Sequence, residues 1–312
     1  MKIHQLNALI ALVDEGSIRG AARVLGLTQP ALGARIAELE QDLGATLVNR
    51  TARGTTLTAA GRALLVHART ITNHIRRAEA EMAQINSRAV ASIAIGASPL
   101  AATELVGPIF TSLQSNVIGV HLSVTEGQFH DLASYLREGG LEFILAQIPP
   151  GGKDTRAFHF EELIAYPLRV VGRKNHPLAD CRHLTDLTGS AWIVGAATSK
   201  NRSTVEELFL EHSLPPPRID MHCDAITCVQ ASIAESNLLG LLVPPLYEHL
   251  PDRIAALPIE DRIRPLRLGL ITLAGVPLSP EAQILTELIR ERSRKLANVS
   301  AAKRRRGTPG TP

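Results

Sequence analysis

The sequence has few cysteines and no long apolar run, and both absences narrow the class of protein. Its three cysteines, Cys181, Cys223 and Cys228, lack the paired spacing of a zinc site, so we expect reduced thiols and no metal or other cofactor. No apolar run approaches the ~20 residues of a membrane span, and the N-terminal segment lacks the apolar core and cleavage site of an export signal. With 312 residues, 45% of them hydrophobic, the chain is expected to be cytoplasmic, multidomain and without a membrane partner.

Charge is modest overall but unevenly distributed. The net charge is +3, whereas the segment up to Arg77 holds ten basic residues against five acidic ones. This excess predicts salt-sensitive binding to phosphate. A second basic cluster, Lys303 to Arg306, lies near terminal glycines and prolines, and we expect residues 299–312 to form a disordered, solvated tail, with non-specific attraction to DNA as the alternative.

Residues 17–37 have the pattern of two short helices separated by a glycine turn. Ser17 and Thr28 are suited to cap the two helices, Gly26 to end the first, and Pro30 to occupy the first turn of the second. The first helix is expected to bury Ala21, Ala22, Val24 and Leu25. In the second, the spacing of Leu32, Ile36, Leu39 and Leu43 predicts one face against a core.

The opposite face of the second helix has little bulk or charge. It carries Gln29, Gly33, Ala34, Ala37 and Gln41. Such a face can enter a DNA major groove closely, where a glutamine can pair with adenine and alanine methyls can meet thymine methyls. The alternative is an ordinary helical hairpin whose small residues only allow close packing.

Residues 47–58 predict a short extended pair around a glycine turn, beside the second helix. Arg53 at its tip suits a phosphate or minor-groove contact, and Arg50 suits the DNA backbone. The alternative is that both are solvated surface arginines.

A longer set of positions resembles the winged helix-turn-helix of LysR-type transcriptional regulators. The matching residues are Ala21-Ala22, Leu25, Thr28-Gln29-Pro30-Ala31-Leu32, Ile36, Leu39-Glu40, Leu43-Gly44, Leu47, Arg50, Leu57-Thr58 and Ala60-Gly61. Two positions depart from the family, which usually has serine at Gly33 and phenylalanine at Val48. The resemblance implies a DNA-binding domain over residues 1–58. Its expected DNA contacts are Thr28, Gln29, Pro30, Ala31, Gly33, Ala34, Arg35, Arg50, Arg53 and Thr58.

Residues 59–88 predict one long linker helix with a narrow apolar stripe. From Leu57 and Gly61 the stripe continues through Leu64, Ala68, Ile71, Ile75, Ala78 and Met82 to Ile85, at spacings of four and three. This spacing favours a coiled-coil seam, with small residues allowing close approach of a partner helix; the alternative is a helix lying on its own protein. A homodimer would read an operator of inverted half-sites in double-stranded DNA. The resemblance further implies a homotetramer and admits RNA polymerase as a partner.

Residues 89–298 change to alternating strands and helices, so the fold class is α/β overall after an all-α head. Strands are predicted at 92–97, 117–125, 141–147, 168–172, 191–194, 218–223, 239–243 and 265–273, and helices at 103–113, 129–137, 203–212, 227–235 and 280–296. The first βαβαβ run predicts a parallel sheet covered on both faces. Two lobes are expected: lobe I at 89–163 and 266–298, and lobe II at 164–265. They resemble type 2 periplasmic binding proteins, as this family's effector domains do.

Loops at the carboxyl ends of these strands are the expected effector site, where helix N-termini can hold an anion. The candidates are Ser98, Pro99, Leu100, Gln128 and Gln147 in lobe I, and Thr198, Ser199, Ile226 and Thr227 in lobe II. Ser98 and Thr227 have the alternative role of helix caps. We expect a small-molecule effector, a small organic anion, that is bound without turnover. The alternative is a small-molecule-binding α/β enzyme, although the loops lack a complete nucleophile elbow or phosphate loop.

Overall fold

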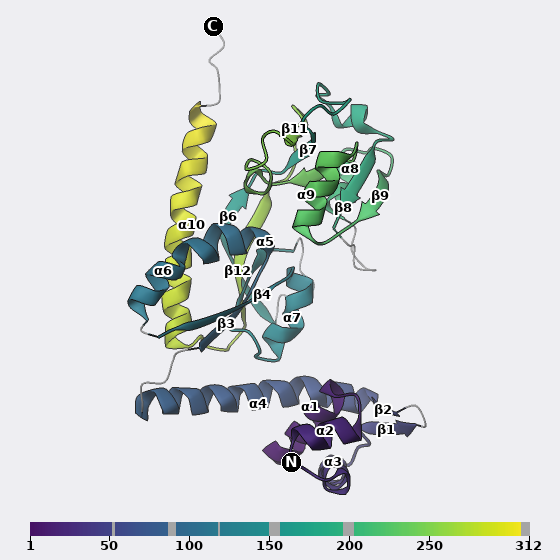
Figure 1. The fold of residues 1–312 in the computed structure, drawn as a ribbon, viewed down its shortest axis with the longest axis vertical. Helices are drawn as coiled ribbons and strands as arrows, with labels where there is room; N and C mark the ends of the chain where they lie inside the picture. The colour runs from purple at the N-terminus through teal and green to yellow at the C-terminus, as the bar shows by residue number, and fades with distance from the viewer. Residues whose placement is uncertain (52–53, 87–91, 118, 150–156, 196–202, 307–312) are drawn as a thin grey trace.

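The chain forms an N-terminal head, a long helix and two α/β lobes (Figure 1). This computed structural model describes residues 1–51, 54–86, 92–117, 119–149, 157–195 and 203–306. We call residues 1–57 the head, and we keep the names lobe I and lobe II for the two α/β parts. Among the described helices, none has both the length and the apolar character that crossing a membrane requires.

The head packs three helices and a hairpin around one small core. Its elements are α1 (Ile3–Asp14), α2 (Ile18–Val24), α3 (Gln29–Leu43), β1 (Val48–Thr51) and β2 (Gly54–Leu57). The strands β1 and β2 pair antiparallel. The core includes Leu6, Leu9, Ala21, Ala22, Leu32, Ile36, Leu39 and Leu47. Two residues expected there are outside it, since Leu43 is 41% and Val24 is 59% exposed.

The first half of α4 (Ala59–Asn86) belongs to the head's packing. The amide of Gly61 donates to the Thr58 hydroxyl at 3.0 Å, which caps the helix as predicted. A Cβ on Gly61 would lie 2.1 Å from the carbonyl oxygen of Leu47, Ala68 is completely buried in the head's core, and Leu64 packs on that core. The prediction that Gly61 and Ala68 face a partner helix is therefore wrong, because the chain's own head covers them, whereas Leu64 is only half-buried and stays a prediction.

Of the rest of the predicted stripe, the side chains that the structure describes are exposed or half-buried in the single chain, and that of Ile85 lies outside them. Ile71 is 36% and Met82 is 53% exposed, Ala78 is exposed, and Ile75 is half-buried. This half of the stripe stays a prediction for a dimer seam.

Lobe I is built on a mixed five-stranded sheet in the order β4-β3-β5-β12-β6. Its strands are β3 (Ser92–Ala97), β4 (His121–Glu126), β5 (Ile144–Gln147), β6 (Phe158–Tyr166) and β12 (Leu266–Leu273). The strand β3 runs parallel to β4 and β5, so the parallel arrangement predicted for the first βαβαβ run is confirmed; β12, whose direction was not predicted, is antiparallel to both β5 and β6. The strand β6 was not predicted, and it carries lobe I past the expected boundary at residue 163.

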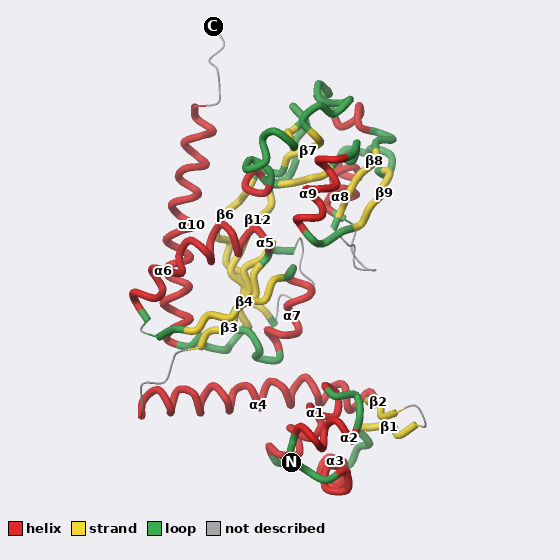
Figure 2. The backbone as a smooth tube through the Cα atoms, viewed as in Figure 1, coloured by secondary structure: helices red, strands yellow, loops and turns green. Residues whose placement is uncertain are grey.

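Helices cover both faces of this sheet (Figures 1 and 2). One face packs against a segment that runs from α5 (Pro99–Ala101) through a π-helical turn η1 (Ala102–Val106) to α6 (Gly107–Asn116), and against α10 (Pro280–Arg306). The other face packs against α7 (Phe129–Arg137). The strand β5 shows the alternation, since Leu145 joins the first core and Ile144 joins the second.

Because α10 continues to Arg306, the prediction of a disordered tail is wrong for residues 299–306. Residues 307–312 lie outside the described ones.

Lobe II has two small sheets joined by a bridge between Trp192 and Leu239. Strands β10-β7-β11 are antiparallel, and β8 and β9 are parallel. The elements are β7 (Arg169–Arg173), η2 (Leu184–Leu187), β8 (Ala191–Val194), α8 (Thr204–Glu211), β9 (Arg218–His222), α9 (Ile226–Glu235), β10 (Gly240–Leu242), η3 (Pro244–Leu246) and β11 (Ile254–Ala256). α8 packs on the Trp192 side and α9 on the Ile193 side, so both faces are covered; β11 was not predicted.

The contact of Gly61 with Leu47 gives a first prediction. Gly61→Ala forces a methyl group into the backbone of the head, and we expect it to destabilise the head by about 1–3 kcal/mol. Thermal unfolding measures this, with Ala60→Ser at the exposed neighbouring position as the control. Equal melting temperatures for the wild type and Gly61→Ala would contradict the close approach.

An ion pair between β6 and α10 gives a second prediction. Nε and Nη2 of Arg290 lie 2.8 and 2.9 Å from the two carboxylate oxygens of Glu161, and these hydrogen bonds lower the pKa of Glu161 from its usual 4.5. Since the folded pKa is depressed, the stabilisation is full above pH ~4.5 and is lost as the pH falls through the folded pKa. Both side chains are about a third exposed, so we expect roughly 1 kcal/mol.

Unfolding between pH 3 and 7 tests this pair. Glu161→Gln is expected to lower the melting temperature at neutral pH and to flatten its fall in acid, whereas Glu235→Gln, in an exposed pair with Arg253, changes little. A wild-type pH dependence in Glu161→Gln would show that the pair contributes nothing.

Candidate nucleic-acid interface and ligand-binding loops

Both α2 and α3 begin at the caps that the sequence predicts. The Ser17 hydroxyl accepts from the amide of Gly20 at 3.0 Å, and the Thr28 hydroxyl accepts from that of Ala31 at 3.3 Å. Gly26 has a φ of +63°, the left-handed conformation that favours glycine, and Pro30 lies in the first turn of α3. These bonds and the left-handed Gly26 define where α2 ends and where each helix begins.

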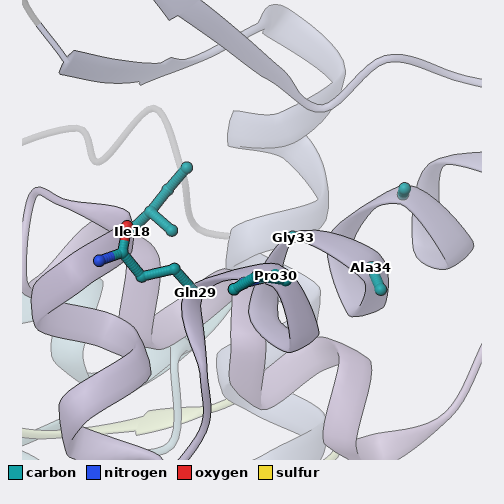
Figure 3. A pocket seen from close by; sticks show the side chains of 6 residues that line it. Ile18, Gln29, Pro30, Gly33 and Ala34 are labelled. Atoms are coloured by element: carbon teal, nitrogen blue, oxygen red, sulfur yellow. The ribbon is translucent and has the colours of Figure 1, made fainter.

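That face carries an open groove of about 660 Å³, lined by Ile18, Gln29, Pro30, Gly33, Ala34 and Ala37. Ile18 and Gln29 lie at one end of it, and Ala34 lies toward the other (Figure 3). Of the predicted contact residues, Thr28, Gln29, Pro30 and Ala34 are exposed, and Ala31, Gly33 and Arg35 are half-buried.

Ile18 is the lining residue that sequence analysis missed. It is the first residue of α2 and follows the cap Ser17, whereas the expected contacts all came from α3 and the hairpin. Its position directly after a helix cap was the available signal, because the first turn of α2 lies against the start of α3.

The chemistry of this groove is that of an amide beside methyl and methylene groups. Such a surface can hydrogen-bond a base edge and contact a thymine methyl without introducing charge. Arg19 is exposed and Arg35 half-buried, and neither forms an ion pair within the part of the chain that the structure describes, so both are open to phosphate.

Glu40 on α3 holds the base of the hairpin. Its Oε1 accepts from the amides of Leu47 at 2.7 Å and Val48 at 3.1 Å, so the start of β1 is fixed relative to α3. Arg50 lies in β1 opposite Thr55, and Arg53 lies outside the described residues.

The Thr58 hydroxyl is already used inside the protein. It donates to the carbonyl of Thr46 at 2.7 Å and accepts from Gly61, so we give Thr58 a structural role and remove it from the proposed DNA contacts.

In lobe I the structure brings Ser98, Gln128 and Gln147 to one edge of the sheet. The amide of Ser98 donates to Leu145 at 2.8 Å, and the amide that precedes Gln128, that of Gly127, donates to Ala97 at 3.0 Å. The buried Ser98 hydroxyl accepts from Ala101 at 3.4 Å, so its capping role is real. In Figure 1, α5 lies on the side of lobe I nearest lobe II.

The Leu100 side chain is only 4% exposed and belongs to the core of lobe I. Its predicted contact with a ligand is therefore wrong for the side chain, which leaves Pro99 and the backbone in that turn.

In lobe II, Ile226 and Thr227 occupy the corresponding place after β9. They are the first residues of α9, Ile226 half-buried and Thr227 exposed. The cap of α9 is Ala225, which forms no side-chain capping bond, so Thr227 is not a helix cap. Thr198 and Ser199 lie outside the described residues.

Comparisons with known proteins agree with this architecture. Two family models match: "Bacterial regulatory helix-turn-helix protein, lysR family" over residues 3–62, and "LysR substrate binding domain" over residues 87–294. The HTH-type transcriptional regulator GbpR of Azospirillum brasilense is 29% identical over 298 residues, covering 94% of this chain and 87% of that protein. The SDS degradation transcriptional activation protein of Pseudomonas sp. is 28% identical over 305 residues, covering 96% of this chain and 99% of that protein.

Solved structures share the fold at lower identity. The crystal structure of CbnR, a LysR family transcriptional regulator, matches with a TM-score of 0.68 at 18% identity, over 94% of this chain and 99% of that chain. Full-length CbnR complexed with its target DNA matches with a TM-score of 0.67 at 18% identity, over 94% and 100%.

The double hydrogen bond of Glu40 gives a third prediction. Glu40→Ala leaves two backbone amides without their acceptor, and we expect a loss of about 1–3 kcal/mol in the stability of the head. Glu40→Gln keeps an oxygen at the same place and is the matched control, expected to lose less. Thermal unfolding in which the two variants melt together would show that the carboxylate does not hold the hairpin.

Proposed function

Because this chain belongs to the LysR family of transcriptional regulators, we propose that its head reads an operator through α3 while a ligand in the two lobes changes how the protein sits on that DNA. The observation that carries this proposal is the uncharged groove on α3, fixed by the caps at Ser17 and Thr28. Because its proposed target is chromosomal DNA, we place its action in the cytoplasm.

We assign base recognition to the groove, and contacts with the DNA backbone or minor groove to the residues around it. Gln29 would pair with a base edge, and Pro30, Gly33 and Ala34 would let the helix approach closely. The cap Thr28, Ala31 and Arg35 on α3, Arg50 in β1, and Arg53 would contact the DNA backbone or minor groove.

The proposed assembly is a homodimer joined along the open half of the α4 stripe. Ile71, Ala78 and Met82 are exposed in the single chain, which supports a partner helix at that position. Two heads related by a two-fold axis would read inverted half-sites, and pairing of dimers would give a tetramer.

The proposed effector is a small organic anion held between backbone amides and neutral side chains. Ser98, Pro99, Gln128 and Gln147 would contribute from lobe I, and Thr198, Ser199, Ile226 and Thr227 from lobe II. The named relatives are transcriptional regulators, so we further propose that the ligand is bound and not turned over; measurable turnover of candidate acids that Ser98→Ala abolishes would favour an enzyme.

Selection of bound fragments from the host genome tests the proposal. The full chain is expected to enrich fragments with inverted half-sites, and organic acids related to the neighbouring genes are expected to change the footprint on them. A monomer with no preference among duplex sequences at moderate salt would overturn the proposal.

Gln29→Ala gives a fourth prediction. Loss of the amide is expected to relax sequence preference at one base pair of each half-site, at about 1–3 kcal/mol, with the salt dependence unchanged. Binding to a randomised operator library measures this, and Gln41→Ala, at the exposed far end of α3, is the control. Replacing single thymines by deoxyuridine then tests whether the groove contacts a methyl group. An unchanged preference in Gln29→Ala would remove this residue from the proposed contacts.

A further inference from the structure

Arg69 of α4 joins the head to lobe I. Its Nη1 lies 2.7 Å from Oε2 of Glu138, and its Nη2 pairs with Oδ1 of Asp14. Asp14 is the last residue of α1, and Glu138 directly follows α7. The side chains of Arg69 and Glu138 are 26% and 18% exposed, so this contact is partly shielded from water. A guanidinium can hold two carboxylates at once because its N–H groups form a fixed fork.

Two neighbours on α4 strengthen the contact with lobe I. The Thr70 hydroxyl lies 2.8 Å from the carbonyl oxygen of Arg137 and donates to it, and the Asn73 amide donates to that of Glu138. The last carbonyls of a helix have no donors within that helix. α4 therefore supplies part of the C-terminal cap of α7.

Gly139 lets this turn approach α4. Its φ is +71°, and a Cβ there would lie 3.1 Å from the Cβ of Asn73. Burial alone lowers the pKa of Arg69, but the hydrogen bond and charge of Glu138, together with Asp14, more than offset it, so the pKa is raised. The charged form of Arg69 is thus the one that fits this junction.

The other end of α7 lies at the proposed ligand-binding edge. Gln128 is the N-cap of α7, and the helix spans about 15 Å from there to Glu138. Leu132, Ala133 and Leu136 are buried against the sheet, so α7 is packed along one side. One short helix therefore connects the proposed ligand loop to Arg69.

We propose that Arg69 is a positioning residue that couples α7 of lobe I to α1 of the head, so that a displacement of α7 changes the orientation of the recognition helix. This inference rests on the proposed function and names the path of its regulation. The coupling element is the pair of ion pairs that Arg69 forms with Asp14 of the head and Glu138 of lobe I.

The experiment compares the full-length wild type with Glu138→Gln and Arg69→Met on one operator fragment selected by the wild type. Circular-permutation gel shifts measure the DNA bend, and nuclease protection measures the footprint. Both variants are expected to change the bend and footprint but keep the wild-type sequence preference and salt slope, since the groove is untouched. Hydrogen exchange at the last turn of α7 is expected to be about tenfold faster. Glu162→Gln, which removes the same charge elsewhere in lobe I, is the control and should match the wild type.

The outcomes separate this inference from the proposed function. If the wild type selects no operator, the proposed function fails. If it does, and both variants give the wild-type bend and footprint, the coupling through Arg69 is overturned. Should Arg69→Met not fold, Glu138→Gln and Thr70→Val still decide the question, because each removes one contact with lobe I and leaves Arg69 on α4.

Discussion

The structure depends on the packing of the first half of α4 into the head. Gly61 against the backbone of Leu47, and Ala68 inside the core, make the long helix a part of the DNA-reading unit and not a tether attached to it. Any rotation of α4 therefore rotates α3 with it. The same helix carries Arg69 toward lobe I and leaves its second half open. The positions of the head, of lobe I and of the proposed dimer seam therefore all depend on α4.

Local signals predicted the head well because its structure is set by short-range chemistry. The caps Ser17 and Thr28, the left-handed Gly26 and the spacing of Leu32, Ile36 and Leu39 all have the predicted roles. What the pattern could not show is which surface covers an apolar residue. Ala68 fits a partner helix and the chain's own head equally well by spacing, and only the three-dimensional packing of α4 on the head decides between them.

The sequence predicted the order of most strands in the lobes, but not the direction of every strand. Alternating segments located most strands, yet β12 returns antiparallel, which no local pattern specifies. Adjacent Glu161 and Glu162 interrupt the alternation of β6, and the role of Glu161 became clear only with Arg290 on α10. For the proposed ligand site, the sequence correctly predicted that the ends of β3, β4 and β5 lie at one edge of the sheet. It could not distinguish Leu100, which is buried in the core, from its neighbours.

The pairing of β6 with β12 also constrains how the lobes can move. The two strands stay hydrogen-bonded up to Tyr166 opposite Leu266, and both connections to lobe II leave the sheet at that end. Because these two connections lie side by side, they can act as a hinge: lobe II can rotate about one axis relative to lobe I, and other rotations are resisted. A small molecule that spans the lobes thus needs to fix only a single angle to hold the whole C-terminal half in one shape.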